Sequence, residues 1–221
     1  MVLKIYGTIP SPPAQIVLLT LKEIGIPYEL IIVNTAEKEQ KTPAYIAKHP
    51  FGQVPLLEDD DGFIVYESRA IARYLVLKYA PNSGLIPKGV KESALFEQAV
   101  SIEISNFTPY VQGIAAEKFF KPTFYGISTD EAKAAEHQAT LEEKLKVYDV
   151  ILSKQKYVAG DSLTLADIFH IPFTAAAVNH AGYKGLEAFP NVSRWWNELT
   201  SRPSYKEVWA SVEEFKAKLK K

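Results

Sequence analysis

The sequence has no cysteine among its 221 residues. This absence excludes disulfide bonds, thiolate metal sites and every mechanism in which a sulfur of the protein acts as the nucleophile. If thiol chemistry takes place on this protein, the thiol must therefore arrive as part of a ligand.

Long apolar runs and an excess of one charge are also missing. No apolar run reaches the ~18 residues that a membrane-spanning helix needs, and the first residues lead into a strand pattern without a signal-like segment. Lys and Arg number 25 against 26 acidic residues, so the chain creates no overall field that would attract nucleic acid or an anionic membrane. We expect a cytoplasmic protein that binds neither nucleic acid nor membrane.

The first 80 residues alternate between strand and helix patterns. The expected elements, in order, are a strand over 2–6, a helix over 12–24, a strand over 28–33, a short helix that begins at Thr42 and Pro43, two strands over 53–58 and 63–67 that form a hairpin, and a helix over 68–79. This βαβαββα order is typical of a compact two-layer α/β domain.

A break in the pattern separates this half from the rest of the chain. Residues 81–90 include Pro81, Gly84 and Pro87 and are expected to form a linker. From 91 to 221 the strand signals vanish and amphipathic helical patterns fill the sequence. We therefore expect an α/β domain over 1–80 and an all-α domain over 91–221.

The stretch HPFGQVP places a proline at the start of a strand. Because proline cannot donate a hydrogen bond to a sheet, Pro55 indicates either an edge strand or a cis-proline turn. A cis-proline turn would leave the N–H and C=O of Val54 unpaired and free to bind an extended peptide as an extra strand.

The stretch VYESRAIARYL allows two interpretations of its strand-to-helix junction. Ser68 is a good candidate for the N-cap of the following helix. The free N–H groups of that helix end can also bind an anion, and the carboxylate of Glu67 can hold an ammonium group. Together, Glu67 and Ser68 suit the head group of an α-amino acid.

Two other hydroxyl residues lie where helices are expected to begin. Thr164 and Asp167 have the spacing of a capping box, which indicates a structural role. Ser11 is followed by Pro12 and Pro13, which suit the first turn of a capped helix. Capping thus explains Ser11 without any chemistry.

Four stretches in this order, PFGQVP, ESRAIARYL, YVAGDSLTLAD and FPNVSRWWNELTSRPS, make the sequence resemble the soluble glutathione transferases, above all their phi-like, serine-dependent branch. The resemblance implies a thioredoxin-like domain followed by an all-α domain. It also implies that glutathione is the co-substrate and is conjugated to apolar or aromatic electrophiles, with reduction of organic hydroperoxides as a further activity. Neither a metal nor any other cofactor is implied.

The resemblance assigns the catalytic role to Ser11, whose hydroxyl would donate a hydrogen bond to the glutathione sulfur and favour the thiolate. Pro12 and Pro13 depart from this pattern, because two prolines remove two amide donors from the first turn of the helix. Tyr6 and Thr8 are alternative hydroxyl residues nearby, although Tyr6 is expected to pack as a strand aromatic.

The resemblance also implies a set of glutathione-binding residues, which are Gln40, Lys41, Gln53, Val54, Pro55, Glu67 and Ser68. Gln53 and Val54 would hold the cysteinyl unit, and the last two residues of the set would hold the γ-glutamyl end. Lys41 would meet the glycyl carboxylate. Its neighbour Gln40 stands where many phi-like proteins have a histidine, which predicts looser binding at that end.

An apolar second substrate would lie between the two domains. Its expected contacts are Pro12, Phe107, Tyr110, Val111, Ile114, Phe119 and Phe120. The stretch 106–126 also contains Phe124 and Tyr125, and its prolines and glycines predict an irregular, aromatic-rich segment that lines a pocket.

The resemblance further predicts a homodimer, in which the aromatic ring of Phe51 would anchor in a neighbouring subunit. Two alternatives to the enzyme are a non-catalytic ligandin that binds aromatic compounds between the domains, and a protein-interaction module with the same fold. Binding of planar dyes without turnover would favour the ligandin. A stable heteromeric partner without glutathione binding would favour the interaction module.

Overall fold

The computed structural model describes residues 3–219, which divide into two compact units. The first unit combines the chain up to Ser83 with the chain from Arg202 onward, and the second unit is Gly84–Ser201. The boundary at Ser83 falls inside the linker expected over 81–90. The expected domain over 91–221 needs a correction at its end, because the final helix belongs to the first unit.

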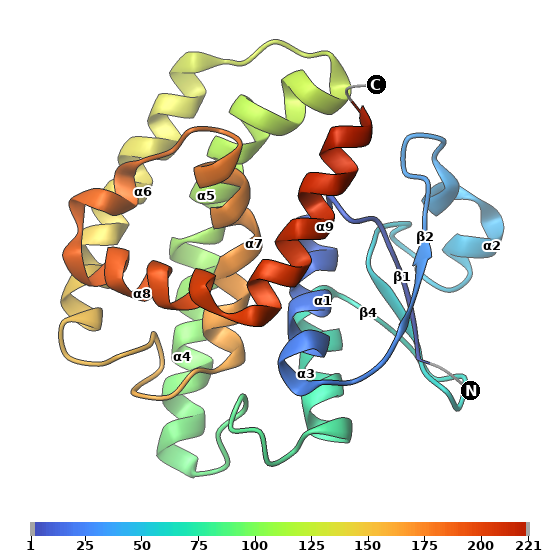
Figure 1. Cartoon of the computed structure of the whole chain (residues 1–221), viewed down its shortest axis with the longest axis horizontal. Helices are drawn as coiled ribbons and strands as arrows, with labels where there is room; N and C mark the ends of the chain where they lie inside the picture. Colours follow the sequence, from blue (N-terminus) through green and yellow to red (C-terminus); the bar gives the residue numbers. More distant parts are fainter. Residues whose placement is uncertain (1–2, 220–221) are drawn as a thin grey trace. The chain divides into compact units, whose positions relative to one another are not determined.

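The first unit is built on a four-stranded mixed sheet in the order β2-β1-β3-β4 (Figure 1). The strands are β1 (Lys4–Gly7), β2 (Glu29–Ile32), β3 (Leu56–Glu58) and β4 (Ile64–Tyr66). β1 runs parallel to β2 and antiparallel to β3, and β3 runs antiparallel to β4. The βαβαββα order that the sequence predicts is therefore confirmed, with an added 3₁₀ turn, η1 (Glu39–Lys41), before the short helix α2 (Pro43–Ile46).

Apolar side chains place helices on both faces of this sheet. On one face, α1 (Pro12–Ile24) and α3 (Ser68–Tyr79) pack together, and their buried Val17 and Ile71 join strand residues such as Ile5 in one core cluster. On the other face, Tyr45 of α2 (Pro43–Ile46) packs against Leu56. Burial of such large side chains contributes about 1.5–3 kcal/mol each, so the two clusters hold the sheet between its helices.

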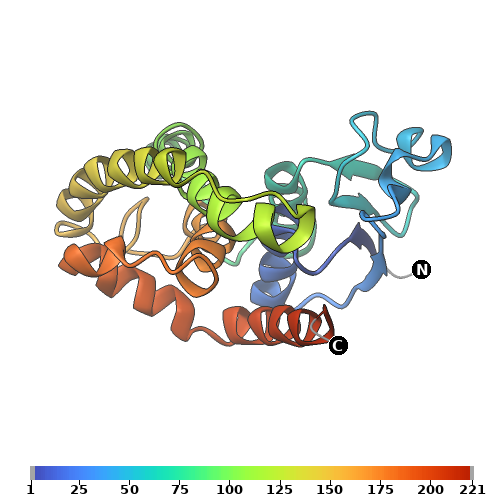
Figure 2. The ribbon, with the colours of Figure 1, turned by 90° about the horizontal axis from the view of Figure 1, so that it is seen from above.

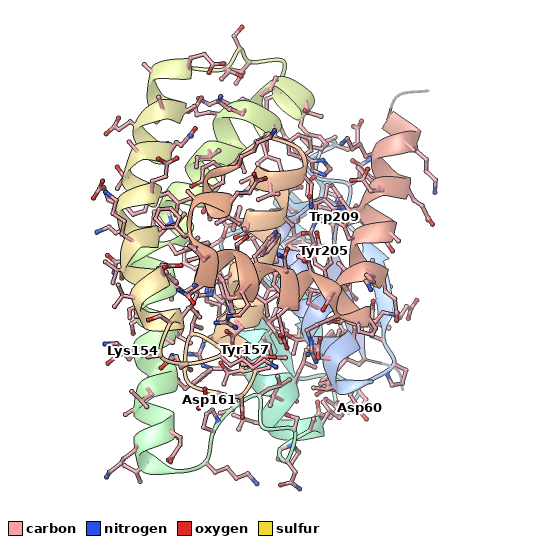
Figure 3. The ribbon with its side chains drawn as sticks, turned by 60° about the vertical axis from the view of Figure 1, so that its left-hand side comes forward. Asp60, Lys154, Tyr157, Asp161, Tyr205 and Trp209 are labelled. Atoms are coloured by element: carbon pink, nitrogen blue, oxygen red, sulfur yellow. The ribbon has the colours of Figure 1, made fainter. Side chains whose placement is uncertain are left out.

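The last helix, α9 (Pro203–Leu219), packs on α1 through charged side chains. Arg202 donates from Nε and a terminal nitrogen to the two carboxylate oxygens of Glu23, at 2.8 and 2.6 Å, and Ser204 also donates to Glu23. Tyr205 and Trp209 both belong to α9, and their rings stack on each other with centroids 5.8 Å apart (Figure 3). This bidentate ion pair ties the end of the chain to its first helix.

The second unit is helical, as the sequence predicts, and its one β element within residues 84–201 is an isolated bridge of Tyr157 and Gly160. Its main helices are α4 (Val90–Asn106), α5 (Thr108–Ala115), α6 (Glu131–Leu152), α7 (Leu165–Asn179) and α8 (Pro190–Ser201), with a 3₁₀ turn, η3 (Gly185–Ala188), between the last two. α7 is buried along nearly its whole length and forms the centre of this unit. No helix within the described residues 3–219 is long and apolar enough to cross a membrane.

The segment after α5 differs from the expectation of an irregular chain. It is a π-helix, η2 (Ala116–Tyr125), which follows α5 directly (Figure 2). π-helical turns are rare and occur frequently at functional sites. Pro122 lies inside this helix and lacks the N–H that an ordinary α-helix would use there.

The capping box of Thr164 and Asp167 is confirmed and forms part of a larger network. The Asp167 carboxylate accepts from the Thr164 N–H at 2.9 Å, from the Val158 N–H at 3.0 Å and from the Trp195 Nε1 at 2.9 Å. One buried carboxylate thus joins the start of α7 to the preceding loop and to α8. The pattern in the sequence indicated only the first of these three contacts.

The turn between β3 and β4 is tied to the end of α3 by another buried carboxylate. Asp59 accepts from Lys78 Nζ at 2.7 Å, from the hydroxyls of Tyr74 and Tyr79, and from the N–H of Asp60 at 2.7 Å. Burial alone would raise the pKa of Asp59, but these donors together hold that pKa well below its usual range. The ionised carboxylate therefore stabilises the folded state.

We expect Asp59→Asn to lower the free energy of unfolding at pH 7 by roughly 2 kcal/mol, because Lys78, Tyr74 and Tyr79 lose the buried, charged acceptor of their hydrogen bonds. A carboxyl with a depressed folded-state pKa contributes stability above its unfolded pKa, and this stability is lost as the pH falls through the folded-state pKa. Urea unfolding measured from pH 7 to pH 2 should therefore show a shallower pH dependence in the variant. Equal slopes in both proteins would contradict this role, and Asp61→Asn, at an exposed neighbour, is the control.

Candidate functional site

The topology of the first unit brings most of the sequence-predicted binding residues to one edge of the sheet. β1, β2 and β4 run in the same direction, so their C-terminal ends meet at this edge. The antiparallel β3 begins there, and Tyr6, Leu56 and Tyr66 are in register across the three strands. The segments with Ser11, with Gln40 and Lys41, with Gln53 to Pro55, and with Glu67 and Ser68 all adjoin this edge.

Ser11 caps α1, as the sequence predicts, and its backbone has the extended conformation usual for that position. Its Oγ accepts a hydrogen bond from the Ala14 N–H at 3.4 Å, which is long for such a bond. Pro12 and Pro13 occupy the first two helical positions. Among residues 3–219, none accepts a hydrogen bond from the Ser11 hydroxyl, so its proton remains available for a ligand.

The hydroxyl of Tyr6 has partners within the protein. It donates to Glu58 Oε2 at 3.2 Å, and Lys48 Nζ approaches both groups, at 3.5 Å from the hydroxyl and 2.6 Å from the carboxylate. The ring lies among the residues that pack beside Leu56. Tyr6 is thus a strand aromatic with an engaged proton, which makes it a weaker candidate for thiol activation than Ser11.

The loop that follows α2 requires a glycine. Gly52 has φ +56°, and a Cβ atom there would lie 2.6 Å from the carbonyl oxygen of Gln40. Its N–H donates to the His49 carbonyl at 2.7 Å, and Lys41 Nζ donates to the Phe51 carbonyl at 2.9 Å. This close approach holds the exposed ammonium of Lys41 beside the loop.

Val54 has the unpaired backbone that the cis-proline interpretation predicts. The Val54-Pro55 peptide bond is cis, and the N–H and C=O of Val54 form no hydrogen bond to any residue of the described chain. The neighbouring Gln53 is exposed at its side chain, while its carbonyl accepts from the Tyr45 hydroxyl at 2.8 Å. A ligand backbone can therefore pair with Val54 without displacing a protein partner.

The start of α3 requires a correction to the predicted cap. Glu67, not Ser68, occupies the N-cap position, and Ser68 is the first helical residue and is buried. Glu67 has φ +72° and ψ 112°, a conformation that a non-glycine residue adopts only at a cost of about 1–3 kcal/mol. Its side chain is exposed and forms no capping hydrogen bond. A free carboxylate thus lies beside the free N–H groups of a helix end.

Gln40 is half-buried and incompletely paired. Its amide nitrogen is 3.5 Å from the Thr35 carbonyl, and its Oε1 is buried with no partner among the described residues. An unpaired buried acceptor is costly, so a donor supplied by a ligand would be favoured here.

His49 is a residue that the sequence did not single out. It is 2% exposed, its ring stacks on Tyr66 with centroids 4.5 Å apart, and Tyr45 and Phe51 lie 6.3 and 6.4 Å away. Its Nδ1 is buried without a partner among the residues described. The signal was present in HPFGQVP, but a single histidine before a proline does not reveal which rings surround it.

Several of the predicted contacts for an apolar substrate lie inside the protein instead. Pro12, Phe107, Val111 and Ile114 are buried. The ring of Phe107 packs against Tyr148 and His170 of the second unit, at 5.3 and 4.6 Å, so it serves as core. Aromatic content alone cannot separate core from surface. The half-buried members of the set are Tyr110, Phe119 and Phe120.

Phe119 and Phe120 form an aromatic cluster on η2. Their centroids are 5.1 Å apart, and Phe124 lies 5.7 and 6.2 Å from the two rings. Phe124 is 38% exposed and Tyr125 is 71% exposed. The buried Glu117 accepts from Lys121 Nζ at 2.6 Å and holds this helix together.

Comparison with known proteins agrees with this geometry. Residues 10–76 match the model of the glutathione S-transferase N-terminal domain, and residues 106–203 match that of the C-terminal domain. The Arabidopsis thaliana protein named glutathione S-transferase PM239X14 is 44% identical over 196 residues, which cover 87% of this chain and 89% of that protein.

Solved structures resemble the chain over nearly its whole length. The crystal structure of glutathione transferase F2 from Populus trichocarpa has 33% identity and a TM-score of 0.90, over 96% of this chain and 99% of that one. Glutathione S-transferase I from maize, in complex with an atrazine glutathione conjugate, has 34% identity and a TM-score of 0.87, over 95% and 97%. With its thioredoxin-like first unit and its helical second unit, the chain belongs to the phi-type branch of the glutathione S-transferase family of enzymes.

Proposed function

We propose that this chain acts in the cytoplasm as an enzyme that joins glutathione to apolar or aromatic electrophiles, and that the Ser11 hydroxyl activates the glutathione thiol. The observation that carries this proposal is the state of that hydroxyl. Its oxygen accepts one long bond from the Ala14 N–H, and its proton has no acceptor among the described residues. The hydroxyl can therefore donate to a sulfur placed at the sheet edge.

The energy needed for activation lies within the reach of one such group. A thiol with a pKa near 8.5 must be shifted by ~2 units to ionise at neutral pH, which requires about 2.7 kcal/mol. A hydrogen bond to a charged group supplies about 1.5–3 kcal/mol. Pro12 and Pro13 remove two amides from the end of α1, so the hydroxyl must supply most of the stabilisation.

Glutathione would bind along the sheet edge as an extended peptide. The free N–H and C=O of Val54 pair with its cysteinyl unit, beside Gln53 and the cis Pro55. The exposed carboxylate of Glu67 takes the ammonium of the γ-glutamyl end, and the buried Ser68 with the start of α3 takes the adjacent carboxylate. The remaining two residues of the binding set, Gln40 and Lys41, would meet the glycyl end.

The second substrate would contact the half-buried aromatic residues of the second unit. Tyr110, Phe119 and Phe120 offer flat apolar surface, and the maize relative was solved with a conjugate of atrazine. We therefore include planar aromatic electrophiles in the proposed range. Reduction of organic hydroperoxides is included as well, because it requires only the bound thiolate.

We expect Ser11→Ala to raise the pKa of the bound glutathione thiol by about 1–2 units, since a charge-assisted hydrogen bond to sulfur is lost. The ultraviolet absorbance of the thiolate, followed against pH with glutathione at saturation, measures this shift directly. Turnover of 1-chloro-2,4-dinitrobenzene at pH 7 should fall about 10- to 100-fold. Thr8→Ala and Tyr6→Phe are the matched controls and should titrate like the wild type.

Two results would count against the proposal. If glutathione binds but its thiol titrates identically in the wild type and in Ser11→Ala, Ser11 is a helix cap and nothing more. If the wild type binds planar dyes and glutathione without turnover of any electrophile, the ligandin alternative replaces the enzyme.

We also propose that the protein is a homodimer and that Phe51 is an anchor of its interface. Phe51 is 64% exposed, and its ring lies edge-on to His49 and Tyr66, at 6.4 and 6.3 Å. The ring of Phe51 is held by these other rings, and its backbone carbonyl accepts a hydrogen bond from Lys41. These contacts keep the exposed aromatic side chain rigid. Rigid aromatic side chains of this kind are typical centres of protein interfaces.

Phe51→Ala should weaken the dimer, because truncation of such an anchor typically costs about 2 kcal/mol or more. That cost corresponds to at least about a 30-fold rise in the dimer dissociation constant. Sedimentation velocity over a dilution series measures it. Phe63→Ala, which removes another exposed aromatic of the same unit, is the control. A monomeric wild type, or equal dissociation constants in all three proteins, would overturn the proposal.

A further inference from the structure

His49 lies in the loop between α2 and β3, and its ring stacks on Tyr66, which directly precedes Glu67. Its ring forms a cluster with Tyr45 of α2, Phe51 of the loop and Tyr66 of β4, which we call the ring cluster. All four residues belong to the first unit. Tyr66 is the last residue of β4 and directly precedes Glu67, so the ring cluster adjoins the sheet edge that the proposed site uses.

The ring cluster is connected by hydrogen bonds to the segment of Gln53 and by the chain itself to Glu67. The Tyr45 hydroxyl donates to the Gln53 carbonyl at 2.8 Å, and the Gly52 N–H donates to the His49 carbonyl at 2.7 Å. Tyr66 immediately precedes Glu67, which has φ +72° and an exposed side chain that makes no capping hydrogen bond. A change at His49 thus reaches Gln53 on one side and Glu67 on the other.

The imidazole is held in a setting that suits its neutral form. His49 is 2% exposed, and its Nδ1 has no partner within residues 3–219 to accept a proton from it. Burial lowers the pKa of His49 below its ordinary value of 6.5, and this effect outweighs the opposite influence of the Glu67 carboxylate. The Lys41 ammonium lowers the pKa further. The neutral imidazole is therefore the favoured form of His49 at pH 7.

The groups around the ring determine what a positive charge would do. Lys41 in η1 repels a charged imidazole, and Glu67 at the start of α3 attracts it. The other ionisable groups packed on the ring are the phenols of Tyr45 and Tyr66. Glu67 is the only carboxylate among these neighbours, and it is the same carboxylate that the proposed function assigns to the ammonium of glutathione.

We propose that His49 is a positioning residue, whose neutral imidazole leaves Glu67 free for the ligand ammonium and whose protonated form draws that carboxylate away and weakens glutathione binding. This inference rests on the proposed function. It makes glutathione affinity fall in mild acid through a group that touches neither glutathione nor the reacting sulfur. By linkage, bound ligand must also disfavour protonation of His49.

The test uses S-methylglutathione, because its thioether cannot ionise and the pH dependence then reports binding alone. We expect the dissociation constant, measured by calorimetry on the full chain, to rise about fivefold from pH 7.5 to pH 5.5 in the wild type. His49→Phe keeps a flat ring in the cluster without a titrating nitrogen. It should bind like the wild type at pH 7.5 and show a flat profile.

His137→Phe, which removes a histidine of the second unit, is the matched control and should keep the wild-type profile. If His49→Phe does not fold, as judged by circular dichroism, His49→Gln replaces it with the same expectation. Ring resonances of histidine in two-dimensional NMR provide a second readout, in which S-methylglutathione should lower the pKa of His49.

The possible failures are distinguishable. A wild type that binds no S-methylglutathione at any pH overturns the proposed function. A wild type that binds it with an unchanged profile in His49→Phe, or with no shift of the His49 resonance titration, overturns the positioning role and leaves the proposed function intact.

Discussion

Unpaired backbone at one edge of a small sheet is the constraint on which the rest of this structure depends. Three parallel strands end there and one antiparallel strand begins there, so three connections of the chain lie at this edge: from β1 to α1, from β2 to β3 and from β4 to α3. Each connection leaves donors or acceptors that the sheet cannot use, as at Val54 and at the start of α3. The ligand of the proposed function, with its peptide backbone and charged ends, carries partners for these groups.

The core of the first unit maintains this arrangement. α1 and α3 pack side by side on one face of the sheet (Figure 1). Both begin at the edge that the proposed site uses, which we call the binding edge, because the strands before them are parallel. Ser11 and Glu67 therefore occupy equivalent positions, each between a strand end and a helix start. Buried residues such as Val17 and Ile71 hold the two helices in one core. The starts of the two helices therefore keep a constant position relative to each other.

Local patterns in the sequence predicted what is decided locally. The cap of α1 by Ser11 and the capping box of Thr164 and Asp167 each depend on residues only three positions apart. The placement of α9 depends on Arg202 and Glu23, which are 179 positions apart. The amphipathic pattern of this helix predicts a helix but does not indicate which other element it packs against. Serine is a favoured cap, so the sequence indicated Ser68, whereas the turn out of β4 places Glu67 at that position. Phe107 shows the same limit, since an aromatic residue suits a core and a pocket equally well.

The two edges of the sheet differ in how completely their polar groups are paired. At the edge away from the site, Asp59 gathers an ammonium, two phenols and an amide, and the turn it closes needs nothing from a ligand. At the binding edge, Glu67 is strained, Val54 is unpaired, and His49 and Gln40 keep buried atoms without partners among the described residues. Paired groups resist change, whereas unpaired and strained groups respond to whatever binds beside them. Within the described part of the first unit, the buried side-chain atoms without a partner thus belong to the segments beside the proposed site, whereas the buried carboxylate of Asp59 at the opposite edge is fully paired.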